Sequence, residues 1–203
     1  MTRVKKVALI CAVLLLLAGV AWVQISHFQR MNAQPTPASA ADVGGSFTLT
    51  DHTGKRVTDV DYAGKYMLVY FGYTFCPDVC PTTLGTIADA LDQMGDYADQ
   101  ITPIFISVDV KRDTPDVLAE YVDAFHPKLI GLTGSRAEID AVVKAYKAYY
   151  SIEDETDPED YAVDHTAMTY LMDPRGRFVT VFSHGTPSET LATQIITALG
   201  GRP

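Results

Sequence analysis

The chain has 203 residues, a formal net charge of -9 and three cysteines. Its hydrophobic content of 47% and charged content of 20% are typical of a folded globular chain and argue against disorder. The acidic balance argues against a nucleic-acid partner, because phosphate binding needs a basic patch. Three cysteines are also too few for a disulfide-stapled scaffold.

The beginning of the chain has the pattern of a membrane anchor. Three basic residues precede an uninterrupted apolar run from Val7 to Val23, which at about 1.5 Å per residue is at the short end of what crosses a bilayer. We therefore expect a cytoplasmic tail over residues 1–6 and a transmembrane helix over residues 7–25, with the body outside the cytoplasm. A cleaved signal peptide is the alternative, because small residues surround Val20. In both interpretations the remainder of the chain lies outside the cytoplasm.

Residues 26–45 are rich in Pro, Ala, Ser and Gly without periodicity, which predicts a flexible linker. The folded domain then covers residues 46–203. It opens with FTLTDHTGKRVT, which alternates around a Thr-Gly turn and predicts a hairpin. YMLVYF, from Tyr66 to Phe71, predicts a buried strand. A helix with Pro81 near its start follows, and ITPIFISVDV predicts a second buried strand.

The second half of the domain continues with alternating elements. We expect a helix from Pro115 capped by Asp113 or Thr114, and a short strand over residues 129–132. Ser135 should cap the helix AEIDAVVKAYKAYY, with core positions at Ala137, Ile139, Val142, Val143 and Tyr146. After an acidic loop, TAMTYLM and RFVTVF flank an Asp-Pro-Arg-Gly turn as a hairpin. SETLATQIITALGG is the last helix.

This order of elements predicts an α/β fold. Strands linked by helices require right-handed parallel crossovers, and the final hairpin adds antiparallel strands. The plan is thioredoxin-like, with an N-terminal hairpin and an inserted strand-helix pair, preceded by one transmembrane helix.

A pair of cysteines, Cys76 and Cys80, lies where the first buried strand of this core leads into its helix. The carboxyl ends of strands in such sheets are where sites form. A helix N-terminus favours anions and should lower the thiol pKa. The two sulfurs could converge on one metal ion or close a disulfide. Simple packing as buried small side chains is the alternative.

Among the five histidines, the position of His165 in the sequence makes it the candidate metal ligand. It precedes the strand expected to run beside the first one, so its loop should lie in the same region of the sheet as the cysteines. The others, at positions 27, 52, 126 and 184, are expected in the linker, in turns or at element ends. Asp78, Asp109 and Asp164 lie near the candidate site and have turn or cap chemistry as their alternative role.

Three segments together carry a family resemblance: FGYTFCPDVCPTTL, SVDVKRDTP and YAVDHTAMTYLMDPRGRF. In this order they resemble the Sco/SenC family of membrane-tethered copper chaperones, over about residues 43–200. The resemblance implies that Cys76, Cys80 and His165 are copper ligands. It also implies a role in assembling the dinuclear copper centre in the second subunit of cytochrome c oxidase. One departure is Val110, where the family usually has proline.

The resemblance implies a single-pass protein of the inner (cytoplasmic) membrane, with its domain in the periplasm or the equivalent mitochondrial intermembrane space. The implied partners are cytochrome c oxidase subunit II, a copper donor protein and a thiol reductant. Soft thiolates with an imidazole suit Cu(I), and Cu(II) could recruit an extra oxygen ligand. Structural zinc normally takes four ligands.

Two enzymatic classes remain as alternatives to a chaperone without enzymatic activity. A thiol–disulfide oxidoreductase is compatible with the paired cysteines, although their spacing differs from that of thioredoxin and no proline directly precedes Thr166. A peroxiredoxin-like peroxidase lacks its expected arrangement of threonine, cysteine and arginine. Seven acids in residues 153–164 suggest a solvated loop, and a mobile loop carrying one ligand would help metal release. They are Glu153, Asp154, Glu155, Asp157, Glu159, Asp160 and Asp164.

Overall fold

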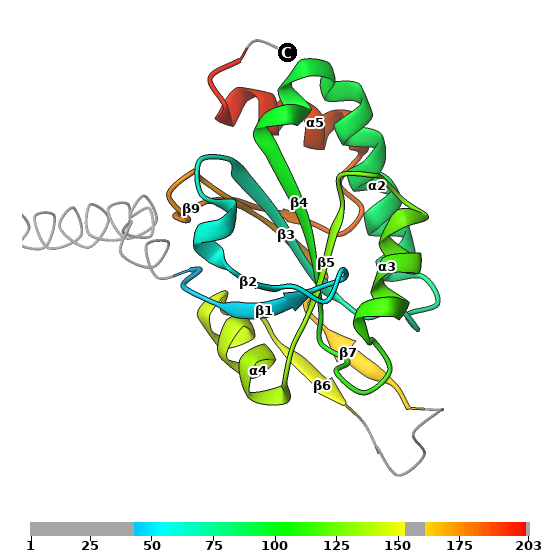
Figure 1. The fold of residues 1–203 in the computed structure, drawn as a ribbon. Coiled ribbons are helices and arrows are strands. Elements are labelled where there is room, and N and C mark those ends of the chain that lie inside the picture. Colours follow the sequence, from blue (N-terminus) through cyan, green and yellow to red (C-terminus); the bar gives the residue numbers. More distant parts are fainter. Residues whose placement is uncertain (1–42, 153–160, 202–203) are drawn as a thin grey trace, which may run out of the picture. The chain divides into compact units, whose positions relative to one another are not determined.

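The computed structural model describes residues 43–152 and 161–201. The predicted tail and anchor, and nearly all of the predicted linker, lie outside these residues. Within the described part of the chain, no helix is long and apolar enough to cross a membrane. The main sheet of this part is seven-stranded, in the order β2-β1-β5-β4-β3-β8-β9 (Figure 1).

The predicted N-terminal hairpin is present at one edge of this sheet. Its antiparallel strands are β1 (Thr48–Asp51) and β2 (Arg56–Thr58). Gly54 in the turn has a φ of 83°, a conformation that glycine adopts without steric cost. A short 3-10 helix, η2 (Asp59–Tyr62), leads from the hairpin to the centre of the sheet. β1 also pairs antiparallel with β5, which joins the hairpin to the parallel strands.

Three parallel strands form the centre, as predicted. They are β3 (Tyr66–Gly72), β4 (Ile101–Ser107) and β5 (Ile130–Thr133). The first crossover contains α2 (Val79–Met94) and the 3-10 helix η3 (Gly95–Gln100), and the second contains α3 (Pro115–Asp123). Thr114 caps α3, because its side chain accepts a hydrogen bond from the Val117 amide. β3 is buried from Met67 to Gly72, as expected of a strand with helices on both faces.

The second half adds the predicted antiparallel hairpin beside β3. Its strands are β8 (Met168–Met172) and β9 (Phe178–Ser183), and α5 (Ser188–Ala198) follows. Two right-handed crossovers in the same direction place α2 and α3 on one side of the strands (Figure 1). The return connection places α4 (Arg136–Ala145) on the other side, and α5 packs against α2. The thioredoxin-like plan with its inserted strand-helix pair is therefore present.

Helix α4 ends at Ala145, so the predicted helix through residue 150 was too long. The amides of Lys147 and Ala148 donate to the carbonyls of Lys144 and Val143, which is the hydrogen-bond pattern of a Schellman cap. The residue in the left-handed conformation is Lys147, with a φ of 54°. Because glycine usually occupies this position, the sequence carried no stop signal. Ala137, predicted in the core, is exposed because it lies on the outer face of the helix.

The residues beyond α4 form a small second sheet that the sequence did not predict. β6 (Tyr150–Ile152) pairs antiparallel with β7 (Val163–His165), and Tyr150 lies opposite His165. Each strand has only three residues, too few for a clear alternating pattern. The acidic residues 153–160, expected to be a loop, lie outside the described residues. The small sheet positions His165 at the end of β7, before the main-sheet strand β8.

The cap of α4 predicts a measurable stabilisation. Lys147→Gly should raise the free energy of unfolding by about 1 kcal/mol, because glycine removes the steric cost of the left-handed conformation. Lys144→Gly is the matched control, since it removes an equally exposed lysine from within the helix and should lower stability by about 1 kcal/mol. Denaturant unfolding of the metal-free protein measures both changes. Equal destabilisation by the two substitutions would contradict the cap.

Candidate metal centre

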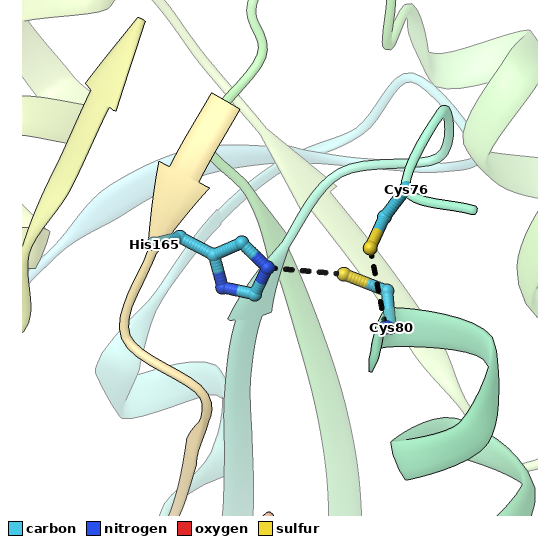
Figure 2. A group of neighbouring side chains, drawn as sticks. All are labelled: Cys76, Cys80 and His165. Atoms are coloured by element: carbon cyan, nitrogen blue, oxygen red, sulfur yellow. Dashed lines mark hydrogen bonds between the residues drawn. The ribbon is translucent and has the colours of Figure 1, made fainter. Parts of the chain in front are cut away.

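The structure brings Cys76, Cys80 and His165 together. Their potential ligand atoms, two sulfurs and one ring nitrogen, all lie within 4.8 Å of one another. Figure 2 shows the imidazole of His165 reaching from β7 toward Cys80 at the start of α2, with Cys76 on the loop before this helix. Two segments separated by most of the domain therefore meet at the carboxyl end of β3, where the predicted site was expected.

Cys80 is fixed by the packing of the first turn of α2 against β3. Its side chain is fully buried, and Tyr70 donates a hydrogen bond to its Sγ over 3.8 Å. A Cβ at Gly72 would lie 2.7 Å from this sulfur. Only a residue without a side chain lets the sulfur approach the end of β3 this closely. Sequence reasoning missed Gly72, although a glycine at the end of a buried strand signals such close approach.

Cys76 lies on the loop between β3 and α2 and is partly exposed. Its Sγ accepts a hydrogen bond from the Cys80 amide at 3.4 Å. The loop is held by Asp113, which accepts hydrogen bonds from the amide and hydroxyl of Thr74 at 2.9 and 2.6 Å and from Ser107 at 2.5 Å. Asp113 was predicted as a possible helix cap. It is instead a fully buried carboxylate that ties the cysteine loop to the end of β4.

His165 presents its Nε2 atom to the cysteines. Nε2 lies 3.3 Å from Cys80 Sγ, and Nδ1 lies 3.3 Å from the carbonyl oxygen of Thr166. A proton on Nδ1 would donate to this carbonyl and leave the Nε2 lone pair for a metal, which is the usual arrangement of a ligating histidine. The rings of Tyr70 and Tyr73 contact the imidazole edge-to-face, at centroid distances of 6.0 and 5.8 Å. The ring is thereby oriented from two sides.

Burial dominates the electrostatics of the site. It raises the pKa of the Cys80 thiol to about 12, so the expectation that the helix N-terminus lowers the thiol pKa is wrong for this residue. Desolvation outweighs the helix dipole because the sulfur lies inside the core. Burial also lowers the pKa of His165, which keeps the imidazole neutral near pH 7. A neutral imidazole binds a metal without first losing a proton.

The other described histidines lie apart from this cluster. His52 accepts a hydrogen bond from the Gly131 amide, His126 lies 3.6 Å from Asp92, and His184 lies 3.0 Å from the hydroxyl of Thr83. His27 is outside the described residues. None of these three described histidines joins the cluster, as expected of residues in turns and at the ends of elements.

The three nearby aspartates differ in their roles. Asp78 precedes α2, and its carboxylate accepts a hydrogen bond from the Thr82 hydroxyl at 3.3 Å. Asp164 is exposed on β7. Asp109 is fully buried and pairs with Arg112, so it is more than the strand-end turn residue of the alternative interpretation.

The arrangement suits a soft, low-coordinate metal ion. Thiolates select Cu(I), zinc and iron–sulfur clusters, and imidazole suits copper as well as zinc. Within the described residues, this is the group of three or more Cys, His, Asp or Glu side chains close enough to hold one ion. Three ligands complete a Cu(I) site, whereas structural zinc sites take four. The chemistry of the donor set therefore favours Cu(I).

Comparisons with known proteins agree with this geometry. The SCO1/SenC family model matches residues 35–200. The chain is 46% identical over 157 residues to human "Protein SCO1 homolog, mitochondrial", covering 76% of this chain and 52% of the relative. It is 48% identical over 160 residues to "Protein SenC" of Rhodobacter capsulatus, covering 79% and 72%. The chain thus spans about half the length of the human relative.

A solved structure is also similar. The crystal structure of Arabidopsis thaliana ScoI with copper bound superposes with a TM-score of 0.73 at 42% sequence identity. The match covers 78% of this chain and 98% of that one.

The burial of the two thiols predicts different reactivities. Cys76 is partly exposed, whereas Cys80 is buried and its raised pKa keeps it protonated at about pH 8 and therefore unreactive. Iodoacetamide should modify Cys76 of the reduced, metal-free protein well before Cys80, as measured by mass spectrometry of peptides. In denaturant both should react at similar rates. Equal rates in the folded protein would contradict the burial of Cys80.

Proposed function

Since this chain belongs to the SCO1/SenC family, we propose that it binds copper through Cys76, Cys80 and His165 and helps assemble the dinuclear copper centre of cytochrome c oxidase. The convergence of two sulfurs and an imidazole nitrogen within 4.8 Å is the observation that carries this proposal. The related Arabidopsis protein, whose structure contains copper, supports copper as the metal.

The three proposed ligands of the copper cargo differ in their exposure to solvent. Cys76 is partly exposed, so it is the ligand that an incoming donor or an outgoing acceptor reaches first. Cys80 is fully buried, and the partly exposed His165 completes the coordination. A cavity of about 400 Å³ opens beside the ligands and is lined by Tyr73, Cys76, Pro77, Asp78, Val79, Val163, Asp164, His165 and Ala167. Its position gives a partner's metal-binding loop access to the copper.

The proposed partners are cytochrome c oxidase subunit II as acceptor, a protein that donates copper, and a thiol reductant. The reductant is needed because both cysteines must be thiols before they bind Cu(I), and exported thiols tend to oxidise. A role as thiol–disulfide oxidoreductase is the second candidate. The observation that favours it is the contact between the Cys80 amide and the Cys76 sulfur, which places the two thiols side by side.

Copper titration tests the leading proposal. The reduced, detergent-solubilised full-length chain should bind one Cu(I) in anaerobic competition with a chromophoric copper chelator. Cys76→Ala and Cys80→Ala should each lower the affinity at least about a hundredfold, and His165→Ala about tenfold or more, because each removes a ligand. His126→Ala removes a histidine outside the cluster and should leave the affinity unchanged.

Unchanged affinity in all three ligand variants would refute the copper site. Reduction of insulin by the wild-type protein, lost in both cysteine variants, would then favour the oxidoreductase.

We further propose that residues 1–6 are a cytoplasmic tail, residues 7–25 a membrane anchor, residues 26–45 a linker and residues 46–203 the copper-binding domain. The apolar run from Val7 to Val23 with its preceding basic residues supports the anchor. The proposed acceptor is an oxidase of the same membrane. An anchored domain would therefore encounter it by diffusion within the plane of the membrane. In a bacterium the domain would face the periplasm.

Membrane fractionation tests the anchor. The full-length protein should sediment with membranes and resist extraction by carbonate at high pH, because a spanning helix is not removed by disrupting electrostatic contacts. Deletion of residues 1–25 should release it. Recovery of the protein in the soluble fraction with its original N-terminus would contradict the anchor, and a mature protein starting beyond Ala21 would identify a cleaved signal peptide.

A further inference from the structure

Arg112 is a charged side chain held in the interior beside the metal centre. It belongs to the segment between β4 and α3, and only 8% of its side chain is exposed. Its Nε donates to Asp109 Oδ2 at 2.5 Å, and this carboxylate is fully buried. The Lys111 and Arg112 amides also donate to Asp109, each at 3.3 Å. The guanidinium is therefore fixed in one place by a charge-assisted hydrogen bond.

Aromatic rings cover the guanidinium. Its central carbon lies 3.6 Å from the ring centre of Tyr161, 4.6 Å from that of Phe75 and 5.8 Å from that of Tyr73. Within the described residues, Nη2 of Arg112 is buried without a hydrogen-bond partner. The described residues around the guanidinium present π faces to it, an environment that a planar guanidinium favours.

These rings come from both segments that carry the cluster. Phe75 is the neighbour of Cys76 in the chain, and Tyr73 contacts the imidazole of His165 edge-to-face. Tyr161 precedes β7, the strand that ends at His165, and its hydroxyl donates to Asp109 Oδ1. The ion pair of Asp109 and Arg112 thus contacts the cysteine loop on one side and the histidine segment on the other.

Other contacts also join the two segments, because Cys80 Sγ lies 3.3 Å from His165 Nε2 and the ring of Tyr70 on β3 contacts the imidazole edge-to-face. β7 pairs with β6 in a sheet separate from the seven-stranded one, and the main sheet is reached at β8, which begins three residues after His165 and pairs with β3. The cysteines have their own supports, because Cys80 lies in α2 and the Cys76 loop is tied by Asp113. The position of His165 at the cysteine pair therefore depends on side-chain contacts as well as on the backbone pairing of β7 and β8.

We propose that Arg112, fixed by Asp109, is a positioning residue that holds His165 at the cysteine pair. The proposal rests on the proposed copper function of these three ligands. Removing the stacked guanidinium would leave both thiols in place but would let the imidazole move away. Copper would then be held by two sulfurs alone, which Cu(I) accepts at lower affinity.

Arg112→Lys is the main test, because it keeps a positive charge for the buried carboxylate but loses the planar stacking surface. Arg112→Ala would leave Asp109 buried and unpaired, which is a separate destabilisation. By the usual effect of residues that orient a ligand, Arg112→Lys should weaken Cu(I) binding by about ten- to a hundredfold. Arg177→Ala is the matched control, since it breaks an Arg–Asp ion pair in the β8–β9 turn, away from both segments.

A double-mutant cycle with His165→Ala identifies the route of the effect. If Arg112 acts by placing His165, adding Arg112→Lys to His165→Ala should change Cu(I) affinity less than about twofold, because the imidazole is already absent. X-ray absorption of the Cu(I)-loaded Arg112→Lys protein should show two sulfur neighbours and a lost nitrogen neighbour. A general loss of structure would remove the two sulfur neighbours as well as the nitrogen neighbour. It would also lower the midpoint of thermal unfolding.

The outcomes separate this inference from the proposed function. Wild-type affinity or a retained nitrogen neighbour in Arg112→Lys overturns the inference, as does an equal loss of affinity in the presence and absence of His165. If the wild-type chain binds no Cu(I), or His165→Ala binds it unchanged, the proposed copper site itself fails. The inference is upheld when His165→Ala weakens binding and Arg112→Lys reproduces that loss without adding to it.

Discussion

The burial of the Cys80 sulfur against the end of β3 is the contact on which the rest of the site depends. This sulfur fits because Gly72 has no side chain, and a methyl group there would also lie 2.8 Å from the ring of Phe105. The position of α2 follows, because its first turn must bring Cys80 to this point. Cys76 and His165 then lie at the rim of a buried thiol, and the exposed side of the site is left to Cys76.

Hydrophobic periodicity was sufficient to predict most elements of the fold. The buried strands β3 and β4, the capped helix α3 and the hairpin of β8 and β9 all have local patterns strong enough to be read from the chain. The meeting of the cysteine pair with a histidine segment also followed from topology, because β8 pairs with β3. These features depend on local periodicity and on the limited number of ways to connect parallel strands.

The unpredicted features depend on tertiary contacts. A lysine in the left-handed conformation ends α4. Its backbone strain is tolerated because the helix is held by its packing in the folded domain, which local sequence does not reveal. β6 and β7 are too short for periodicity and are defined by their pairing. Asp109 was recognised as a residue near the site, but its pairing with a stacked Arg112 joins segments that are distant in sequence. The thiol pKa was predicted in the wrong direction because the depth of Cys80 outweighs its place on the helix.

That depth has a consequence for metal binding. A buried thiol with a raised pKa resists ionisation, because burial removes the hydration that a thiolate would have in water. If Cys80 binds copper as proposed, the bound cation would stabilise the thiolate and displace the proton, so copper binding and proton release from Cys80 would be coupled. The neutral imidazole of His165 would add a ligand to the proposed site without adding charge. Two thiolates and Cu(I) would leave a single net negative charge in the proposed site, which the helix N-terminus would stabilise. In the proposed copper site, the burial that makes Cys80 a poor free thiolate would therefore couple its ionisation to metal binding.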